Sequence, residues 1–389
     1  MKNPSIAVTD YQLKMMKGGG QKVVQALVNN LEKSYPVFHV GYPGEVKCKR
    51  DISPYVEMPK AAETKVEALK SNKLLNLNPI KKLIRYAFHR FRFVSNRTLK
   101  KAEVPCDIII SNSNYDDIIM LNDSRFHLNY KAAIFIKHNP YYDFNWFYPD
   151  RLIKDKVFRI IALNSVDYKL LSIKYSKKNV RLIYPVIELK KARPEPGYIE
   201  KLGITDKHRV IVSIGRFDET QKKLSVAITA IALASKLDDN LRYFIAGSGQ
   251  DQALYEKLIV KYGLENKVKI LGFISDSQKY SLMQRGDIVL QPSVRENFSS
   301  VTLEAMTYGS IILTSRNSGS VDIVNDGKNG FFLEMNAEDI ASKILKILSL
   351  DKVKTRKIKN NAIKTASRFS SKEMINQYKA VIDEIAGEI

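Results

Sequence analysis

The sequence has few cysteines and no long apolar run. Cys48 and Cys106 are its only cysteines, and they form no C-x-x-C pair. This pattern argues against a disulfide framework and a cysteine zinc cage, and it favours a reducing compartment. No apolar stretch approaches the roughly 20 residues of a membrane-spanning helix. Residues 1–16, MKNPSIAVTDYQLKMM, lack the apolar core and cleavage site of a secretory signal, so we expect a cytoplasmic protein.

Metal-ligand patterns are also missing. No D-x-D triplet occurs, and the five histidines, at positions 39, 89, 127, 138 and 208, show no ligand spacing. We therefore expect no catalytic metal and no cofactor, with positive side chains taking the role that a metal would have.

Acidic residues are outnumbered by basic ones. The formal net charge is +22, and residues 60–101 hold 12 Lys and Arg against Glu63 and Glu67 alone. A surface of this kind attracts polyanions, either nucleic acid or an acidic lipid surface. A basic protein with no specific polyanionic partner is the alternative.

Residues 80–94 have an apolar stripe at helical spacing. The stripe consists of Ile80, Leu83, Ile84, Ala87, Phe88, Phe91 and Val94. Basic side chains occupy other positions of the same segment, namely Lys81, Lys82, Arg85, His89 and Arg92. The segment is either a helix packed on its own domain or a helix lying on an anionic membrane, with its basic face toward the headgroups.

Apolar strands alternate with helical segments along the whole chain, which predicts parallel sheets with ligands at the carboxyl ends of their strands. In the first half, SIAVTDY precedes a glycine-rich turn and an amphipathic helix. CDIIISNS and KAAIFIKHN follow as strands. The face of this first helix is formed by Val23, Val24, Leu27, Val28 and Leu31.

Residues 184–200 are rich in proline and charge, and they predict the connection between two domains. A second series follows: RVIVSIGRF, a helix from about Ser225, LRYFIAGSG, a helix, KVKILGFI, DIVLQPS, a helix from about Ser300, SIILTS and GFFLE. A helix over 370–387 ends the chain. We expect an α/β protein of two doubly wound halves with a cleft between them.

The segment SVRENFSSVTLEAM places Glu296 in a loop and Glu304 eight residues later in the first turns of a helix. The start of that helix offers unpaired N–H groups, which suit a phosphate. Carboxylates accept hydrogen bonds from sugar hydroxyls, so a phosphate between two of them predicts a nucleotide-sugar site. Arg216 follows the second domain's first strand, and Lys222 and Lys223 follow at the next helix. These cations could neutralise a departing diphosphate.

Several motifs together resemble one family. The order G-R-F…K-K, A-G-S-G, L-G-F, QPSVRENF, LEAMTYG and NDGKNGF is similar to that of the GT-B retaining glycosyltransferases with the E-x7-E motif, of the family 4-like bacterial cell-surface glycan type. The resemblance is strong over residues 208–335. In the first half, GGGQKVV and IKHNP resemble the family's glycine loop and its histidine-containing strand end.

The resemblance implies a GT-B fold of two Rossmann-like domains. It implies an acceptor-binding domain of residues 1–187 plus 370–389 and a nucleotide-sugar domain of residues 188–369. Glu296 would bind the transferred sugar, Arg216 and Lys222 the diphosphate, and His138 would lie near the sugar on the acceptor side. The implied donor-binding residues are Glu304, Gly18, Gly19, Lys223, Asn297, Phe298, Ser300, Val301 and Thr302.

The implied activity is transfer of a hexose or an N-acetylhexosamine, with retention, from a nucleotide-sugar that we expect to be UDP-linked. The expected acceptor is a membrane-associated glycan or lipid in cell-surface polysaccharide synthesis. The expected location is the inner face of the cytoplasmic membrane, held through residues 80–101, with no nucleic acid bound.

The chain departs from the family pattern in three places. The lysine comes one residue late after Arg216, so Lys222 and Lys223 both remain candidates for the phosphate contact. Gly309-Ser310-Ile311 lacks the usual proline, and Val321-Asp322 replaces a Pro-Glu pair. Two other functions remain open: a polyanion- or nucleic-acid-binding protein, and a catalytically silent GT-B partner subunit.

Overall fold

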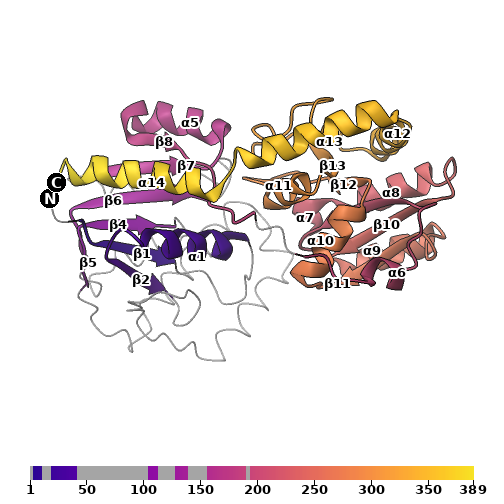
Figure 1. The fold of residues 1–389 in the computed structure, drawn as a ribbon, viewed down its shortest axis with the longest axis horizontal. Coiled ribbons are helices and arrows are strands. Elements are labelled where there is room, and N and C mark those ends of the chain that lie inside the picture. Colours follow the sequence, from indigo (N-terminus) through magenta and orange to yellow (C-terminus); the bar gives the residue numbers. More distant parts are fainter. Residues whose placement is uncertain (1–2, 11–18, 42–103, 113–127, 139–155, 190–192) are drawn as a thin grey trace, which may run out of the picture. The chain divides into compact units, whose positions relative to one another are not determined.

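The computed structural model describes residues 3–10, 19–41, 104–112, 128–138, 156–189 and 193–389 (Figure 1). The chain forms two compact units. Unit 1 comprises Met1–Leu163, Asp167–Val186 and Met374–Ile389, and unit 2 comprises Asn164–Val166 and Ile187–Glu373. The predicted domain limits lay at 187/188 and 369/370, close in sequence to the changes of unit at 186/187 and 373/374. None of the described helices is both long and apolar enough to span a bilayer.

Unit 1 is built on a parallel six-stranded sheet in the order β2-β1-β4-β6-β7-β8. β4 and β6 are buried along their whole length, as expected for parallel strands covered on both faces. A parallel pair, β3-β5, lies apart from this sheet. The described elements are β1 (Ile6–Asp10), α1 (Gly19–Leu31), β2 (Val37–Gly41), β3 (Val104–Pro105), β4 (Ile108–Ser111), β5 (Leu128–Asn129), β6 (Ala132–Lys137), β7 (Val157–Ala162), α5 (Ser165–Tyr175), β8 (Val180–Leu182) and α14 (Ser371–Ala386).

Two helices cover the core of unit 1. The predicted apolar face of α1 is confirmed, since its five members are buried. The terminal helix α14, yellow in Figure 1, packs on the same core through Tyr378 and other apolar side chains. Its last turns are also held by charge: Arg159, whose side chain is 6% exposed, donates to Glu384 at 2.6 Å. The chain end is therefore part of unit 1.

Unit 2 contains a second parallel sheet in the order β11-β10-β9-β12-β13-β14. Numbered within the unit, this is the order 3-2-1-4-5-6 of a dinucleotide-binding fold. Its elements are α6 (Tyr198–Lys201), β9 (Arg209–Ile214), α7 (Glu219–Lys222), α8 (Leu224–Ala234), β10 (Leu241–Ala246), α9 (Gln252–Lys261), β11 (Val268–Gly272), α10 (Asp276–Arg285), β12 (Ile288–Gln291), α11 (Ser300–Thr307), β13 (Ile311–Ser315), β14 (Phe331–Leu333), α12 (Ala337–Leu348) and α13 (Lys352–Ser367).

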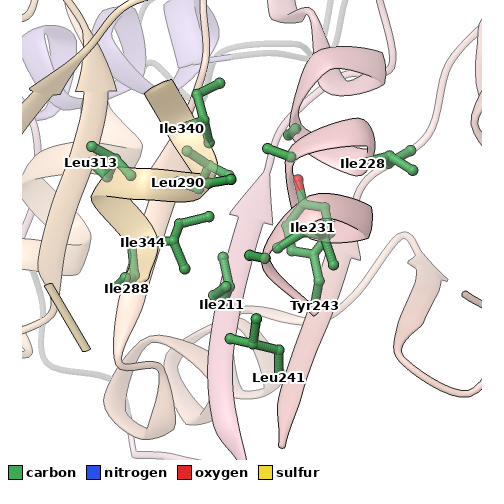
Figure 2. Packing of buried hydrophobic residues seen from close by; sticks show 14 of the residues in the cluster. Ile211, Ile228, Ile231, Leu241, Tyr243, Ile288, Leu290, Leu313, Ile340 and Ile344 are labelled. Carbon is green, nitrogen blue, oxygen red and sulfur yellow. The ribbon is translucent and has the colours of Figure 1, made fainter. Parts of the chain in front are cut away.

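The core of unit 2 lies between its sheet and helices α8 and α12. Figure 2 shows Ile211, Tyr243 and Leu290, from three strands, beside Ile231 of α8 and Ile344 of α12. All five are fully buried. This packing fixes the sheet, so that the loops at the carboxyl ends of its strands start from defined positions.

Every strand predicted for unit 2 is present. The helices predicted near Ser225 and Ser300 begin at Leu224 and Ser300. Helices α6, α7, α10, α12 and α13 are missing from the predicted series, and α6 begins inside residues 184–200, which were predicted as the connection between the domains. α10 has few apolar positions, and its clearest local signal is a capping box between Ser275 and Gln278.

Candidate active site at the carboxyl ends of the unit 2 strands

The site begins where the strand order of unit 2 reverses. β9 and β12 are neighbours. The chain continues from β9 to β10, toward one edge of the sheet, and from β12 to β13, toward the other edge. Ligands of open parallel sheets bind at this crevice, beyond the carboxyl ends of the strands. The loop after β9 carries Arg216, and the loop after β12 carries Glu296. Both predicted residues therefore lie at the place where this fold binds its ligands.

Two glycines allow the loops after β9 and β10 to pack directly on each other. Gly247 has a φ of 139°, and a Cβ atom there would lie 1.8 Å from the carbonyl oxygen of Gly215. At Gly249 a Cβ atom would lie 2.3 Å from the carbonyl oxygen of Phe217. The amide of Phe217 in turn donates to the carbonyl of Ser248 at 2.9 Å. The A-G-S-G motif thus positions the backbone on either side of Arg216.

Lys222 contacts the first of the two predicted carboxylates. Its Nζ lies 2.5 Å from Oε2 of Glu296, and the two side chains are only 14% and 19% exposed. Lys223 lies differently: its backbone is left-handed, with a φ of 48°, and its Nζ is 4.0 Å from Glu219. Arg216 is exposed, with one long contact of 3.4 Å to Gln221. The structure thus places Lys222, and not Lys223, beside Glu296.

The loop that carries Glu296 is held by backbone hydrogen bonds. The amide of Val294 donates to the carbonyl of Gln221 at 2.8 Å, and Gln221 Nε2 donates to the carbonyl of Arg295 at 3.1 Å. The amide of Gly319 donates to the carbonyl of Glu296 at 2.8 Å. A Cβ atom at Gly319 would meet the backbone of the same loop at 2.7 Å. The loop that carries Glu296 is therefore held by hydrogen bonds to two other segments, at Gln221 and at Gly319.

Helix α11 begins next to this loop. Ser299 caps it by accepting the amide of Thr302, and Thr302 is fully buried. The amides of Ser300 and Val301 precede the helix's own hydrogen bonds, so they are the donors that a bound anion would meet. Of the other predicted residues, Asn297 is partly buried and Phe298 packs on the ring of Phe369 at 5.7 Å.

Glu304, the second predicted carboxylate, has a partner that was not predicted. Its Oε2 lies 2.8 Å from Nζ of Lys279 on α10, and its side chain is 13% exposed. Burial, the largest single effect, acts to lower the pKa of Lys279, but its contacts with Glu304, Tyr280 and Asp276 act to raise it, and the net effect is a raised pKa. Lys279 was missed because α10 was missed.

Each of the two carboxylates in the site is paired with a lysine. Lys222 faces Glu296 and Lys279 faces Glu304, while Arg216 adds a positive charge at the exposed edge. An incoming anion would therefore meet one exposed cation and one that must first leave its carboxylate. Within the described ranges, no group of three or more His, Cys, Asp or Glu side chains could hold a metal ion.

Unit 1 has its own polar cluster at the carboxyl ends of β1, β4 and β6. His138 Nε2 makes a short hydrogen bond with Oδ1 of Asn112, which follows β4. Thr9 of β1 and Lys137 of β6 are also buried there. Burial, and secondarily the charge of Lys137, lowers the pKa of His138 to about 4, so its imidazole is neutral at pH 7. Asn112 was not predicted; it is visible only as the polar end of CDIIISNS.

Some predicted features cannot be placed in the fold. Gly18 and the basic segment 80–101 lie outside the described residues. Gly19 is described, and it is the first residue of α1.

Residues 195–365 match the protein-family model described as "Glycosyl transferases group 1". The match lies within unit 2, covers less than half of the chain and includes all four of Arg216, Lys222, Glu296 and Glu304. Unit 2 is therefore similar to the glycosyl transferases group 1 domain.

Curated relatives are similar over a comparable stretch. An uncharacterized glycosyltransferase of Methanocaldococcus jannaschii is 31% identical over 193 residues, which are 48% of this chain and 49% of that protein. The N-acetylgalactosamine-N,N'-diacetylbacillosaminyl-diphospho-undecaprenol 4-alpha-N-acetylgalactosaminyltransferase of Campylobacter jejuni is 30% identical over 203 residues, 51% of this chain and 52% of that protein. The chain thus spans about half the length of these relatives.

Solved structures resemble the whole chain. Anabaena HepE, solved in complex with UDP and glucose, has a TM-score of 0.68 at 18% identity and covers 98% of this chain and 100% of its own. A glycosyltransferase of Rickettsia africae has a TM-score of 0.68 at 16% identity and covers 99% of both chains. At such identities the similarity concerns the fold. The predicted fold class, a GT-B arrangement of two Rossmann-like α/β domains, is confirmed.

Proposed function

We propose that this protein is a glycosyltransferase that moves a sugar from a nucleotide-sugar to a lipid or glycan acceptor. The observation that carries the proposal is the convergence, at the switch point of unit 2, of the Lys222–Glu296 pair, the start of α11 and Glu304. Phosphate-binding amides flanked by two carboxylates match a diphosphate with a sugar at each end. The similarity of residues 195–365 to the glycosyl transferases group 1 supports the same activity.

The proposed roles follow from this geometry. Arg216, Lys222 and the first amides of α11 would bind the diphosphate, while Glu304 would accept hydrogen bonds from the ribose hydroxyls. Glu296 would accept hydrogen bonds from hydroxyls of the transferred sugar. Negative charge grows on the diphosphate as the sugar leaves, so donors fixed in advance stabilise that charge without reorganising.

We further propose that the transfer retains the anomeric configuration. The bond between the sugar's anomeric carbon and the diphosphate oxygen breaks, and the acceptor oxygen bonds to the same face of that carbon. The acceptor's proton moves to an oxygen of the departing diphosphate, so no protein nucleophile is required. The protein contributes orientation and charge stabilisation.

The proposed donor is a UDP-sugar and the proposed acceptor is membrane-associated. Support for UDP is the fold shared with HepE, which was solved with UDP bound. Support for a lipid-linked acceptor is the similarity to the Campylobacter enzyme, whose name specifies a diphospho-undecaprenol substrate. The sugar itself, whether a hexose or an N-acetylhexosamine, would be identified by the donor screen.

A screen of UDP-, GDP-, ADP- and dTDP-sugars tests the proposal. We expect donor hydrolysis or transfer with one nucleotide class, unchanged in EDTA, and loss of binding in Glu304→Ala. NMR of the released or transferred sugar should show the anomeric configuration of the donor. Turnover that is abolished by EDTA would contradict metal independence, and an inverted product would contradict retention. If no nucleotide binds, the proposed donor site is wrong.

For the membrane, we propose that residues 80–101 bind anionic lipid on the inner face of the cytoplasmic membrane. The support is their sequence, with basic residues beside an apolar stripe. Reversing Lys81, Lys82 and Arg85 to Glu should reduce sedimentation with anionic vesicles and leave neutral vesicles unaffected. The matched control reverses Lys354, Arg356 and Lys357, which are equally basic on α13. An equal effect of both triple variants would show that net charge alone, and not this segment, drives binding.

A further inference from the structure

Lys279 is a buried cation with a fixed backbone position. The residue is 9% exposed and lies in the first turn of α10. The side chain of Ser275 accepts the amide of Gln278, and the Gln278 side chain accepts the amide of Ser275, which fixes this turn. A buried lysine is uncommon unless it is paired, so its partners indicate why it is there.

The partners of Lys279 point toward the candidate site. Its Nζ lies 2.8 Å from Oε2 of Glu304 and 3.1 Å from Oδ1 of Asp276, which is more exposed. The same Nζ lies 4.7 Å from the centre of the Tyr280 ring, and that ring packs on Tyr308 at 4.9 Å. Lys279 is thus enclosed by two carboxylates and an aromatic ring, and it remains charged.

This contact constrains Glu304 in a particular way. The ion pair uses Oε2, and in the described part of the chain no polar contact engages Oε1. A carboxylate held through one oxygen presents the other in a defined direction, whereas an unpaired carboxylate would sample several rotamers. Defined orientation matters for a vicinal diol, whose two hydroxyls can bond a carboxylate only in a narrow range of geometries.

We propose that Lys279 is a positioning residue that orients Glu304 toward the ribose hydroxyls, and that it thereby sets the preference for ribonucleotide over deoxyribonucleotide donors. The inference rests on the proposed function, which assigns the ribose to Glu304. Losing a hydrogen bond to a charged group corresponds to about a 10- to 100-fold change in affinity, which is the size of the preference that we expect.

Calorimetric titration with UDP, 2′-deoxy-UDP and 3′-deoxy-UDP tests whether Lys279 sets the preference for ribonucleotides. If another base binds better than uracil, the same three diphosphates of that base are used. The wild-type protein should prefer the ribonucleotide by about 10- to 100-fold. Lys279→Met should reduce that ratio to a few-fold, and Lys279→Arg should restore most of it. Lys267→Met is the matched control, because Lys267 is another lysine of unit 2 with a close ion pair, to Asp239 at 2.5 Å. The ratio in this variant should equal that of the wild type.

The ratio of ribonucleotide to deoxyribonucleotide affinity distinguishes a loss of Glu304 orientation from a general loss of nucleotide binding. If Lys279→Met weakens all three nucleotides equally and keeps the wild-type ratio, Lys279 is structural only and the inference is wrong. Should Lys279→Met fail to fold, Lys279→Gln, which is polar but uncharged, replaces it: a reduced ratio in that variant supports the inference, and a wild-type ratio contradicts it. If the ratio survives in Glu304→Gln, the inference is overturned. Failure of the wild-type protein to bind any nucleotide would instead overturn the proposed function.

Discussion

Lys222 Nζ lies 2.5 Å from Oε2 of Glu296, although 74 residues separate them in the sequence. In the proposed reaction these two side chains have different ligands, since Lys222 meets the diphosphate and Glu296 meets the sugar. The pair must therefore open when the donor binds. A nearly buried ion pair keeps both charges compensated until then, which avoids leaving either group desolvated and alone.

The first prediction distinguishes the two adjacent lysines. Lys222→Met should reduce kcat/KM about 100- to 1000-fold, because it removes one preorganised charge from the departing diphosphate. Lys223→Met should change kcat/KM by less than about threefold, since its side chain is directed to Glu219. Steady-state kinetics on both variants measure this. A larger loss in Lys223→Met would assign the phosphate contact to Lys223.

The second prediction concerns product binding. Glu296→Gln should bind the bare nucleoside diphosphate about tenfold more tightly than the wild type, because Lys222 no longer has to leave a carboxylate. Turnover should fall in the same variant, since the sugar hydroxyls lose a charged acceptor. Titration calorimetry and kinetics measure the two effects. Glu256→Gln, on the surface of α9, is the control. Weaker binding in Glu296→Gln would mean that the ion pair does not compete with the diphosphate.

The third prediction concerns the glycine contact behind Arg216. Gly247→Ala should destabilise unit 2 by about 3 kcal/mol or more, because its Cβ atom would collide with the Gly215 carbonyl oxygen and its φ of 139° strains the backbone. Gly263→Ala is the matched control. Its φ is also positive, at 61°, but nothing lies within 4 Å of the added atom, so only about 1–2 kcal/mol is expected. Calorimetric unfolding compares them, and equal losses would contradict the close contact.

The fourth prediction concerns pH. The pKa of His138 is about 4 in the folded protein, below the ordinary value of 6.5. The unfolded chain therefore binds the proton first, and stability falls as the pH is lowered from about 6.5 to 4, by up to about 3 kcal/mol. Above pH 6.5 this contribution is constant. His138→Gln should remove that part of the pH dependence. An unchanged unfolding profile in the variant would show that His138 is protonated normally.

Much of the fold could be predicted because parallel strands that are buried on both faces appear as continuous apolar runs. LRYFIAGSG and SIILTS are examples, and their strands occur where expected. α10 could not be predicted in this way, because it is largely polar and only three of its side chains are apolar and buried, namely Tyr280, Leu282 and Met283. The capping box between Ser275 and Gln278 is a weaker signal, and it was not recognised in the sequence.

The site was predictable to the extent that it depends on local sequence. Glu296 and Glu304 belong to one continuous segment, and Arg216 follows a strand. The pairing of Glu304 with Lys279 depends on how α10 packs beside α11, and no local pattern encodes that. The same holds for Asn112 and His138, which are brought together because β4 and β6 are adjacent in the sheet.

A crystal structure with a bound nucleoside diphosphate would test the central claim most directly. We predict that the diphosphate lies at the first turn of α11, that Lys222 Nζ has moved from Glu296 to a phosphate oxygen, and that the ribose hydroxyls meet Glu304 while Lys279 remains on its Oε2. A nucleotide bound elsewhere, or one at this site with the Lys222–Glu296 pair still closed, would contradict the account.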